Sequence, residues 1–227
     1  MNKMNNVAEV SYLATLGSAS FEKSKYTAQL CITDQENDTQ AYIVEDKDTI
    51  YLTFHSDLEL SSFSSKTFSS LNLNKAYWEL WRDLSDQVAE EMMQRRLDMS
   101  EGITPKKRVV YCGHGIGGAL ATIAAATHFP DECVTFGSPP IGSSRIPTGH
   151  TAHTCYVLHT DPIPWVNFWK TSYGHLGTLV YIDGDMNAVV RPSLWTLVKL
   201  RVFNKSDIND NQMSWYKAGV WVNGDII

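Results

Sequence analysis

Apolar residues near the start of the chain change from a helical spacing to the alternation of strands. Residues 4–17 carry apolar side chains three positions apart, which predicts an amphipathic helix. Residues 27–33 and 40–55 alternate apolar and polar positions, which predicts strands. A polar turn at residues 46–48 divides the second of these segments. The chain is therefore predicted to begin with a helix and to continue into a group of strands.

The strongest helical pattern occupies residues 76–97. Its apolar side chains form one stripe at helical spacing, which predicts a helix packed on a core and not a cofactor site. The preceding residues 56–75 contain seven serines with apolar residues between them. That composition predicts a long surface loop, either a plain connection or a lid over a pocket. The stripe consists of Tyr77, Trp81, Leu84, Val88 and Met92.

Short apolar runs alternate with helical patterns in the second half of the chain. This alternation predicts an α/β domain with a largely parallel central sheet. No repeat or linker divides the chain, so we expect a single domain over residues 1–227. The predicted strands are 108–112, 133–136, 155–159 and 178–182, and the predicted helices are 117–128, 192–203 and 212–221.

Composition and charge exclude several classes of protein. Hydrophobic residues make up 43% of the 227 residues and the formal net charge is −6. The chain has no basic surplus to neutralise phosphates, so we expect no nucleic-acid partner. It has no apolar run long enough for a transmembrane segment and none that resembles a signal peptide, so we expect a cytoplasmic protein. The four cysteines form no C-x-x-C pair, which favours buried free thiols over a metal site or disulfides, and no cofactor motif is present.

The segment 113–118 has the sequence Gly-His-Gly-Ile-Gly-Gly and joins the strand at 108–112 to a helix rich in small residues. Strand, sharp turn and helix form the context of a nucleophile elbow, whose pattern is G-x-S-x-G. Gly113 and Gly117 occupy the two outer glycine positions. Gly115 occupies the middle position, where the pattern has serine.

Four segments together resemble the class 3 lipases, the fungal-type triacylglycerol lipases of the α/β-hydrolase superfamily. Residues 108–121 are similar to that family's V-x-x-T-G-H-S-L-G-G-A-L-A, and residues 135–142 to its T-F-G-x-P-R-V-G. Residues 159–164 resemble its D-P-V-P segment, and residues 173–177 resemble a Y-x-H-x-G segment that is usually structural. The segments occur in the family's order.

The resemblance implies an α/β-hydrolase fold and hydrolysis of lipid esters by a serine, a histidine and an aspartate. It places the nucleophile position at Gly115, which has no side chain to attack an ester, and the acid at Asp161. The histidine position falls near Asn211 or Gln212, and neither amide can take up and return a proton at neutral pH as a general base does. His175 is the last histidine of the sequence and precedes the final predicted strand.

The resemblance also implies donors for an oxyanion. Residues 54–57 align with the family's F-R-G-T/S, which places Asp57 near one donor position. A carboxylate there would repel a developing oxyanion. The second donor is the backbone N–H of Ile116, which follows the nucleophile position.

Three functions remain open from the sequence. The first is a catalytically inactive lipase-like protein with a binding or scaffolding role, its partner a lipid or acyl chain or another protein. The alternative is a lipase or esterase in which Gly115 replaces the serine nucleophile. The third uses Ser138 or Ser143 as a relocated nucleophile with His150 or His153 as its base.

A binding role has two candidate surfaces. The N-terminus of the helix at 117–128 offers backbone N–H groups and a positive dipole end to an anion or carbonyl. The aromatic residues Trp165, Phe168 and Trp169 either line an apolar groove beside the 56–75 loop or pack in the core.

Overall fold

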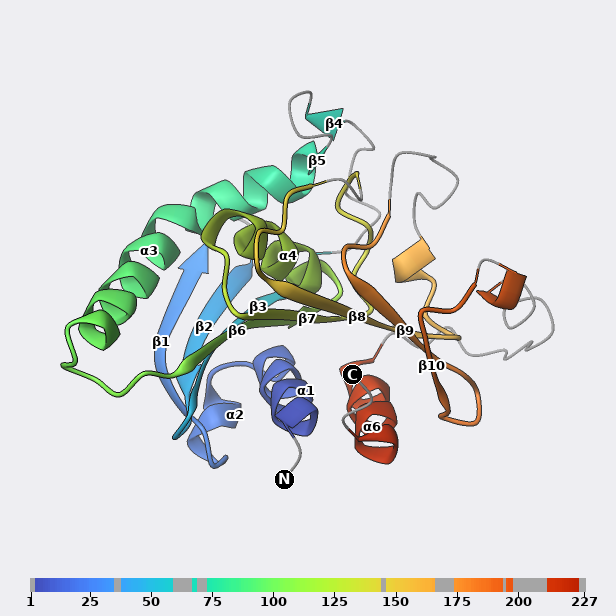
Figure 1. The fold of residues 1–227 in the computed structure, drawn as a ribbon, viewed down its shortest axis with the longest axis horizontal. Helices are drawn as coiled ribbons and strands as arrows, with labels where there is room; N and C mark the ends of the chain where they lie inside the picture. Colours follow the sequence, from blue (N-terminus) through green and yellow to red (C-terminus); the bar gives the residue numbers. More distant parts are fainter. Residues whose placement is uncertain are drawn as a thin grey trace.

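The protein has three layers, with a twisted central sheet covered by helices on both faces (Figure 1). The expected α/β-hydrolase arrangement, with its largely parallel sheet, is confirmed. The structure is a computed structural model that describes residues 3–34, 38–58, 67–68, 73–143, 146–165, 174–193, 195–197 and 212–224.

The central sheet has eight strands in the order β1-β2-β3-β6-β7-β8-β9-β10. The run from β3 to β9 is parallel, whereas β1, β2 and β10 pair antiparallel at the two edges. A two-residue pair, β4 with β5, lies outside it. The strands are β1 (Thr27–Asp34), β2 (Thr39–Glu45), β3 (Thr49–Ser56), β4 (Thr67–Phe68), β5 (Leu73–Asn74), β6 (Arg108–His114), β7 (Glu132–Phe136), β8 (Ala152–Leu158), β9 (Thr178–Ile182) and β10 (Ala188–Val190).

The helices divide between the two faces of the sheet (Figure 1). Helices α3 and α4 cover one face, and α1, α2 and α6 cover the other. Each face has its own apolar core, because the parallel strands are buried on both sides. The helices are α1 (Lys3–Thr15), α2 (Ala19–Glu22), α3 (Lys75–Ser100), α4 (Ile116–His128), the 3-10 helix η2 (Ile163–Trp165) and α6 (Met213–Asn223).

The long helix α3 buries the predicted stripe against α4 and the sheet. Its N-terminus is capped by Asn74, whose side-chain oxygen accepts a hydrogen bond from the Ala76 N–H at 3.0 Å. Helix α4 is buried along nearly its whole length, which explains its small residues, since they let α3 and the sheet approach it closely. The interpretation of the stripe as core is confirmed.

Some sequence predictions need correction. Cys31 is exposed and not buried, because β1 is an edge strand and this residue faces away from the core, although all four thiols are free as expected. Strand β10 and helix α2 were not predicted, since elements of three and four residues carry almost no periodic signal. Trp165 is buried in a core cluster, which is the core-packing alternative of the two given for it.

Several predicted features lie wholly or largely outside the described residues. Phe168 and Trp169 are among them, as is most of the 56–75 segment apart from β4 and β5. Of the helix predicted at 192–203, the structure describes a single helical turn at 195–197. Within the described part of the chain, no helix combines the length and the apolar character needed to cross a membrane.

Candidate functional site

The turn between β6 and α4 has the backbone geometry of a nucleophile elbow. Gly115 has φ 56° and ψ −124°, a backbone conformation that L-residues with a side chain rarely adopt. Its N–H donates to the Phe136 carbonyl of β7 at 2.9 Å, and its own carbonyl accepts from the Ala119 N–H at 3.2 Å. The conformation is therefore held by the neighbouring strand and by the first turn of α4.

The four glycines of this turn serve different purposes. A Cβ on Gly113 would overlap the backbone of Gly117, and one on Gly117 would overlap the Phe54 carbonyl of β3. A Cβ on Gly118 would lie 2.8 Å from the Cβ of Ser138. Around Gly115, in contrast, no heavy atom of the described residues lies within 4 Å of the Cβ position. With respect to the described residues, torsion alone restricts a Cβ at position 115.

Asp161 follows β8, and its side chain is 1% exposed. Its Oδ2 accepts a hydrogen bond of 2.5 Å from the Tyr216 hydroxyl, and its Oδ1 accepts one of 2.8 Å from the Ile163 N–H. The Tyr216 hydroxyl in turn accepts a hydrogen bond from the Leu158 N–H at 3.2 Å. A phenol from α6 thus contacts the carboxylate that the resemblance identifies as the acid.

Tyr216 is completely buried, and its phenol is held in the protonated form. Burial raises its pKa well above the ordinary value, and the neighbouring Asp161 carboxylate raises it further. The Tyr216 ring also lies 5.6 Å from the ring of His114, the residue before Gly115. The structure therefore connects the elbow to Asp161 through a tyrosine.

Tyr216 was not identified from the sequence. It lies in the stretch that aligns with the family's histidine, but the expectation placed that position at Asn211 or Gln212. Gln212 is an exposed residue at the N-cap of α6, and Asn211 lies outside the described residues. An aromatic residue one helical turn into the helix predicted at 212–221 was the available signal, and it resembles ordinary core packing.

The two oxyanion positions differ in their surroundings. Ile116 is the first residue of α4 and is buried, and the N–H groups of a first helical turn lack intrahelical acceptors. The Asp57 side chain is 77% exposed, and its Oδ1 lies 3.1 Å from the Nε2 of His55. Water and His55 therefore screen the charge of Asp57, which weakens the repulsion expected at this position.

Three residues of the relocated-nucleophile hypothesis have surroundings that the structure describes, and Ser138 donates its hydroxyl to a carbonyl and not to a histidine. The Ser138 hydroxyl is buried and donates to the Pro139 carbonyl at 3.1 Å. The Nε2 of His153 is buried without a hydrogen-bond partner. His150 lies against the ring of Phe129, with 6.4 Å between the ring centroids.

His153 gives the fold a specific pH dependence. Its side chain is 8% exposed, and burial lowers its pKa from 6.5 to about 4. The unfolded chain therefore binds more protons between these values, so stability falls as the pH drops from about 6.5 to 4. We expect a loss of up to about 3 kcal/mol from this residue. His128, whose pKa is lowered to about 4 by burial and by Arg96, acts in the same direction.

Urea denaturation of the wild type and of His153→Gln from pH 7 to pH 4 measures this contribution. The free energy of unfolding of the variant should depend less on pH than that of the wild type. The dependence that remains should come from His128. His150→Gln, which removes an exposed histidine, should keep the wild-type slope. Identical slopes for His153→Gln and the wild type would show that His153 is protonated in the folded protein.

Among the described residues, no three His, Cys, Asp or Glu side chains are grouped so as to hold a metal ion.

The chain is similar in sequence to known lipases. The family Lipase (class 3) matches residues 48–171, just over half of the chain. Secreted mono- and diacylglycerol lipase 1 of Fusarium solani is 26% identical over an alignment of 134 residues, and the match covers 54% of this chain and 39% of the relative. The match to secreted mono- and diacylglycerol lipase A of Penicillium cyclopium also has 26% identity and covers 39% of that relative. The chain thus matches about two fifths of the length of these curated relatives.

Solved structures show the same fold. Lipase II from Rhizopus niveus superposes with a TM-score of 0.74 at 16% identity, over 93% of this chain and 96% of that chain. A triacylglycerol lipase from Penicillium expansum gives a TM-score of 0.70 at 17% identity, over 92% and 91% of the two chains. With the family match across β3, the elbow and β8, these findings show that the chain belongs to the class 3 lipase family and has the α/β-hydrolase fold.

Proposed function

We propose that this protein is a non-catalytic member of the class 3 lipase family that binds an acyl lipid beside the elbow. The contact between Tyr216 and Asp161 carries the proposal. Where the family mechanism requires a histidine oriented by the acid, Asp161 accepts a hydrogen bond from a phenol whose pKa is raised. A phenol in that state keeps its proton at neutral pH and cannot serve as the general base.

The space at Gly115 supports a binding role. A Cβ at that position meets no described heavy atom within 4 Å, and the position adjoins the N-terminus of α4. Backbone N–H groups at a helix N-terminus favour a carbonyl or carboxylate oxygen. The relatives are mono- and diacylglycerol lipases by name, so a monoacylglycerol or fatty acid is the ligand class that we propose.

Filling the space at Gly115 tests the binding role. Gly115→Leu is expected to weaken binding of a medium-chain monoacylglycerol at least about tenfold, because the new side chain occupies the proposed site. The measurement is calorimetric titration below the micelle-forming concentration of the lipid. Gly102→Leu is the matched control. Gly102 also has a positive φ, of 75°, and no described atom lies within 4 Å of its Cβ position. Gly102 lies between α3 and β6, however, whereas Gly115 follows β6. Equal losses in both variants, or a wild type that does not bind, would contradict the proposal.

A second candidate is a lipase or esterase in which Gly115 replaces the serine. The retained elbow torsions and the open space favour it, because a serine would fit without a clash among the described residues. Gly115→Ser separates the two candidates. We expect its hydrolysis of p-nitrophenyl butyrate to stay at the wild-type level, because Asp161 accepts a hydrogen bond from the Tyr216 phenol, which keeps its proton at neutral pH. Turnover of about 1 s⁻¹ or more, the lower end of ordinary enzyme rates, would support the second candidate instead.

A further inference from the structure

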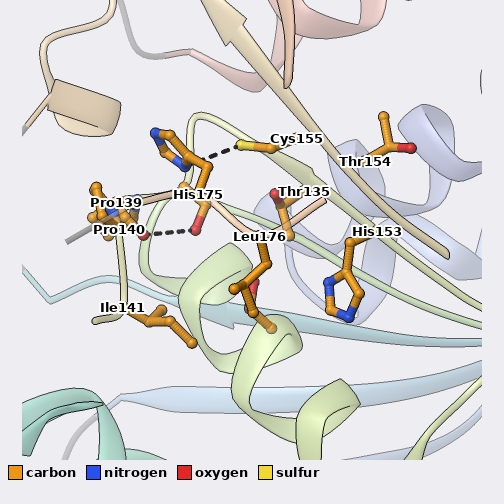
Figure 2. A pocket seen from close by; sticks show the side chains of 12 residues that line it. Thr135, Pro139, Pro140, Ile141, His153, Thr154, Cys155, His175 and Leu176 are labelled. Atoms are coloured by element: carbon orange, nitrogen blue, oxygen red, sulfur yellow. Dashed lines mark hydrogen bonds between the residues drawn. The ribbon is translucent and has the colours of Figure 1, made fainter. Parts of the chain in front are cut away.

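A cysteine and a histidine meet beside a small cavity on the α4 face of the sheet, apart from the elbow. The Sγ of Cys155 lies 3.4 Å from the Nδ1 of His175 (Figure 2). The Nε2 of His175 lies 3.0 Å from the carbonyl oxygen of Pro164. A carbonyl oxygen accepts hydrogen bonds and never donates them, so Nε2 carries a proton and donates it.

This arrangement fixes the role of the other ring nitrogen. With Nε2 protonated, Nδ1 of the neutral ring is the acceptor that faces the thiol of Cys155. A proton can therefore move from Sγ to Nδ1, which leaves a thiolate beside an imidazolium. Nucleophile, base and a third group that orients the base are the three parts of an activated nucleophile.

Three elements hold the pair in place. Cys155 lies in β8, paired with Thr135 of β7. His175 follows Gly174, whose N–H donates to the Gly142 carbonyl at 3.0 Å. Pro164 belongs to η2, next to the Ile163 N–H that donates to Asp161. The geometry is thus set by a strand, a bridged segment and a helical turn.

The charged form of the pair is favoured. Burial raises the pKa of the Cys155 thiol, but the His175 imidazole and hydrogen bonds from His175 and Thr135 bring the pKa below its ordinary value. Burial lowers the pKa of His175, whereas Cys155 and the Pro164 carbonyl raise it. The net effect is a pKa above the ordinary value of histidine. Two other buried thiols lack such a partner: burial raises the pKa of Cys112 to about 11 and that of Cys133 well above its usual value.

The cavity admits only the smallest reagents. Its volume is about 10 Å³, the lower limit for one water molecule, so hydrogen peroxide, which has one oxygen more, enters as the surrounding side chains move. Thr135 lies at its wall near the pair, and His153 lies farther along β8 (Figure 2). The Nε2 of His153 is buried without a hydrogen-bond partner among the described residues.

We propose that Cys155 is a peroxide-reactive thiolate, held as an ion pair with His175 beside this cavity. The sulfur attacks one oxygen of hydrogen peroxide, and the S–O bond forms as the O–O bond breaks. The departing hydroxide takes the proton from the His175 imidazolium and leaves as water. The product is a sulfenic acid at Cys155 and a neutral His175.

Cysteines of the same molecule provide the first test. In a Cys31→Ser background, which removes the exposed thiol, native protein is pulsed with hydrogen peroxide at pH 7, denatured and analysed by mass spectrometry for each thiol. Cys155 is expected to be oxidised at least about tenfold faster than Cys112, because the thiolate is the reactive form and burial keeps the thiol of Cys112 protonated at pH 7. Equal or slower oxidation of Cys155 would overturn the proposal, and this comparison requires no change at the pair.

A variant of His175 provides the second test. His175→Gln keeps an amide that can donate to Pro164 but cannot hold a positive charge. Its Cys155 oxidation should slow at least about tenfold at pH 7, and its thiolate absorbance at 240 nm should appear only at higher pH. An unchanged rate and titration curve in the folded variant would show that His175 does not activate the thiol.

Discussion

Gly117→Ala is expected to lower the free energy of unfolding by at least about 4 kcal/mol, or to prevent folding. A Cβ on Gly117 would overlap the Phe54 carbonyl oxygen of β3 and lie 2.7 Å from its carbon. Both atoms belong to the backbone of a central strand, so no flexible side chain can move aside. Relief would require α4 to shift away from the sheet, which would disturb its packing against both the sheet and α3.

Gly115→Ala, two residues earlier in the same turn, is the matched control. It meets no described atom within 4 Å, so its cost comes from the positive φ alone, on the order of 1–3 kcal/mol. Chemical denaturation of both variants, followed by circular dichroism, gives the two values. If Gly117→Ala were as stable as Gly115→Ala, the close approach of β3 to α4 would be refuted.

Tyr216→Phe is expected to destabilise the protein by about 3 kcal/mol. The change removes the hydroxyl that donates to Asp161 Oδ2 and accepts from the Leu158 N–H. Both groups are buried, and the phenylalanine ring offers them no replacement. Removing a donor from a buried carboxylate lowers the stability of a protein much more than removing a hydrogen bond at the surface.

Tyr51→Phe removes the same atom from a comparable pair and serves as the control. The Tyr51 hydroxyl donates to Asp46 at 2.9 Å, but Asp46 is partly exposed and water can replace the donor. Its cost should stay below about 1 kcal/mol. Urea denaturation at pH 7 compares the two variants. Similar costs for both would show that Tyr216 contributes little to the environment of Asp161.

The sequence was sufficient to predict the framework of this fold. Apolar runs such as 108–112 and 178–182 are short and uninterrupted because their strands are buried on both faces, and this pattern indicates a parallel sheet. The spacing of Gly113, Gly115 and Gly117 predicted the sharp turn, since few other residues permit such torsions and contacts.

The partners of the site residues were not predictable in the same way. Tyr216 lies 55 residues after Asp161 along the chain, and its position depends on how α6 packs on the sheet. Cys155 and His175 are 20 residues apart and belong to a strand and an irregular segment. No periodic pattern links such positions, because tertiary packing determines which side chains meet.

The torsions of Gly115 also concern handedness. Glycine is achiral, so its conformational map is symmetric under reversal of both signs. Reversing the signs of φ 56° and ψ −124° gives the extended, polyproline-like region that L-residues prefer. The backbone of the elbow thus has, at this residue, the conformation natural to a D-amino acid. Every L-side chain introduced there works against the chirality of the chain, whereas glycine is indifferent to it.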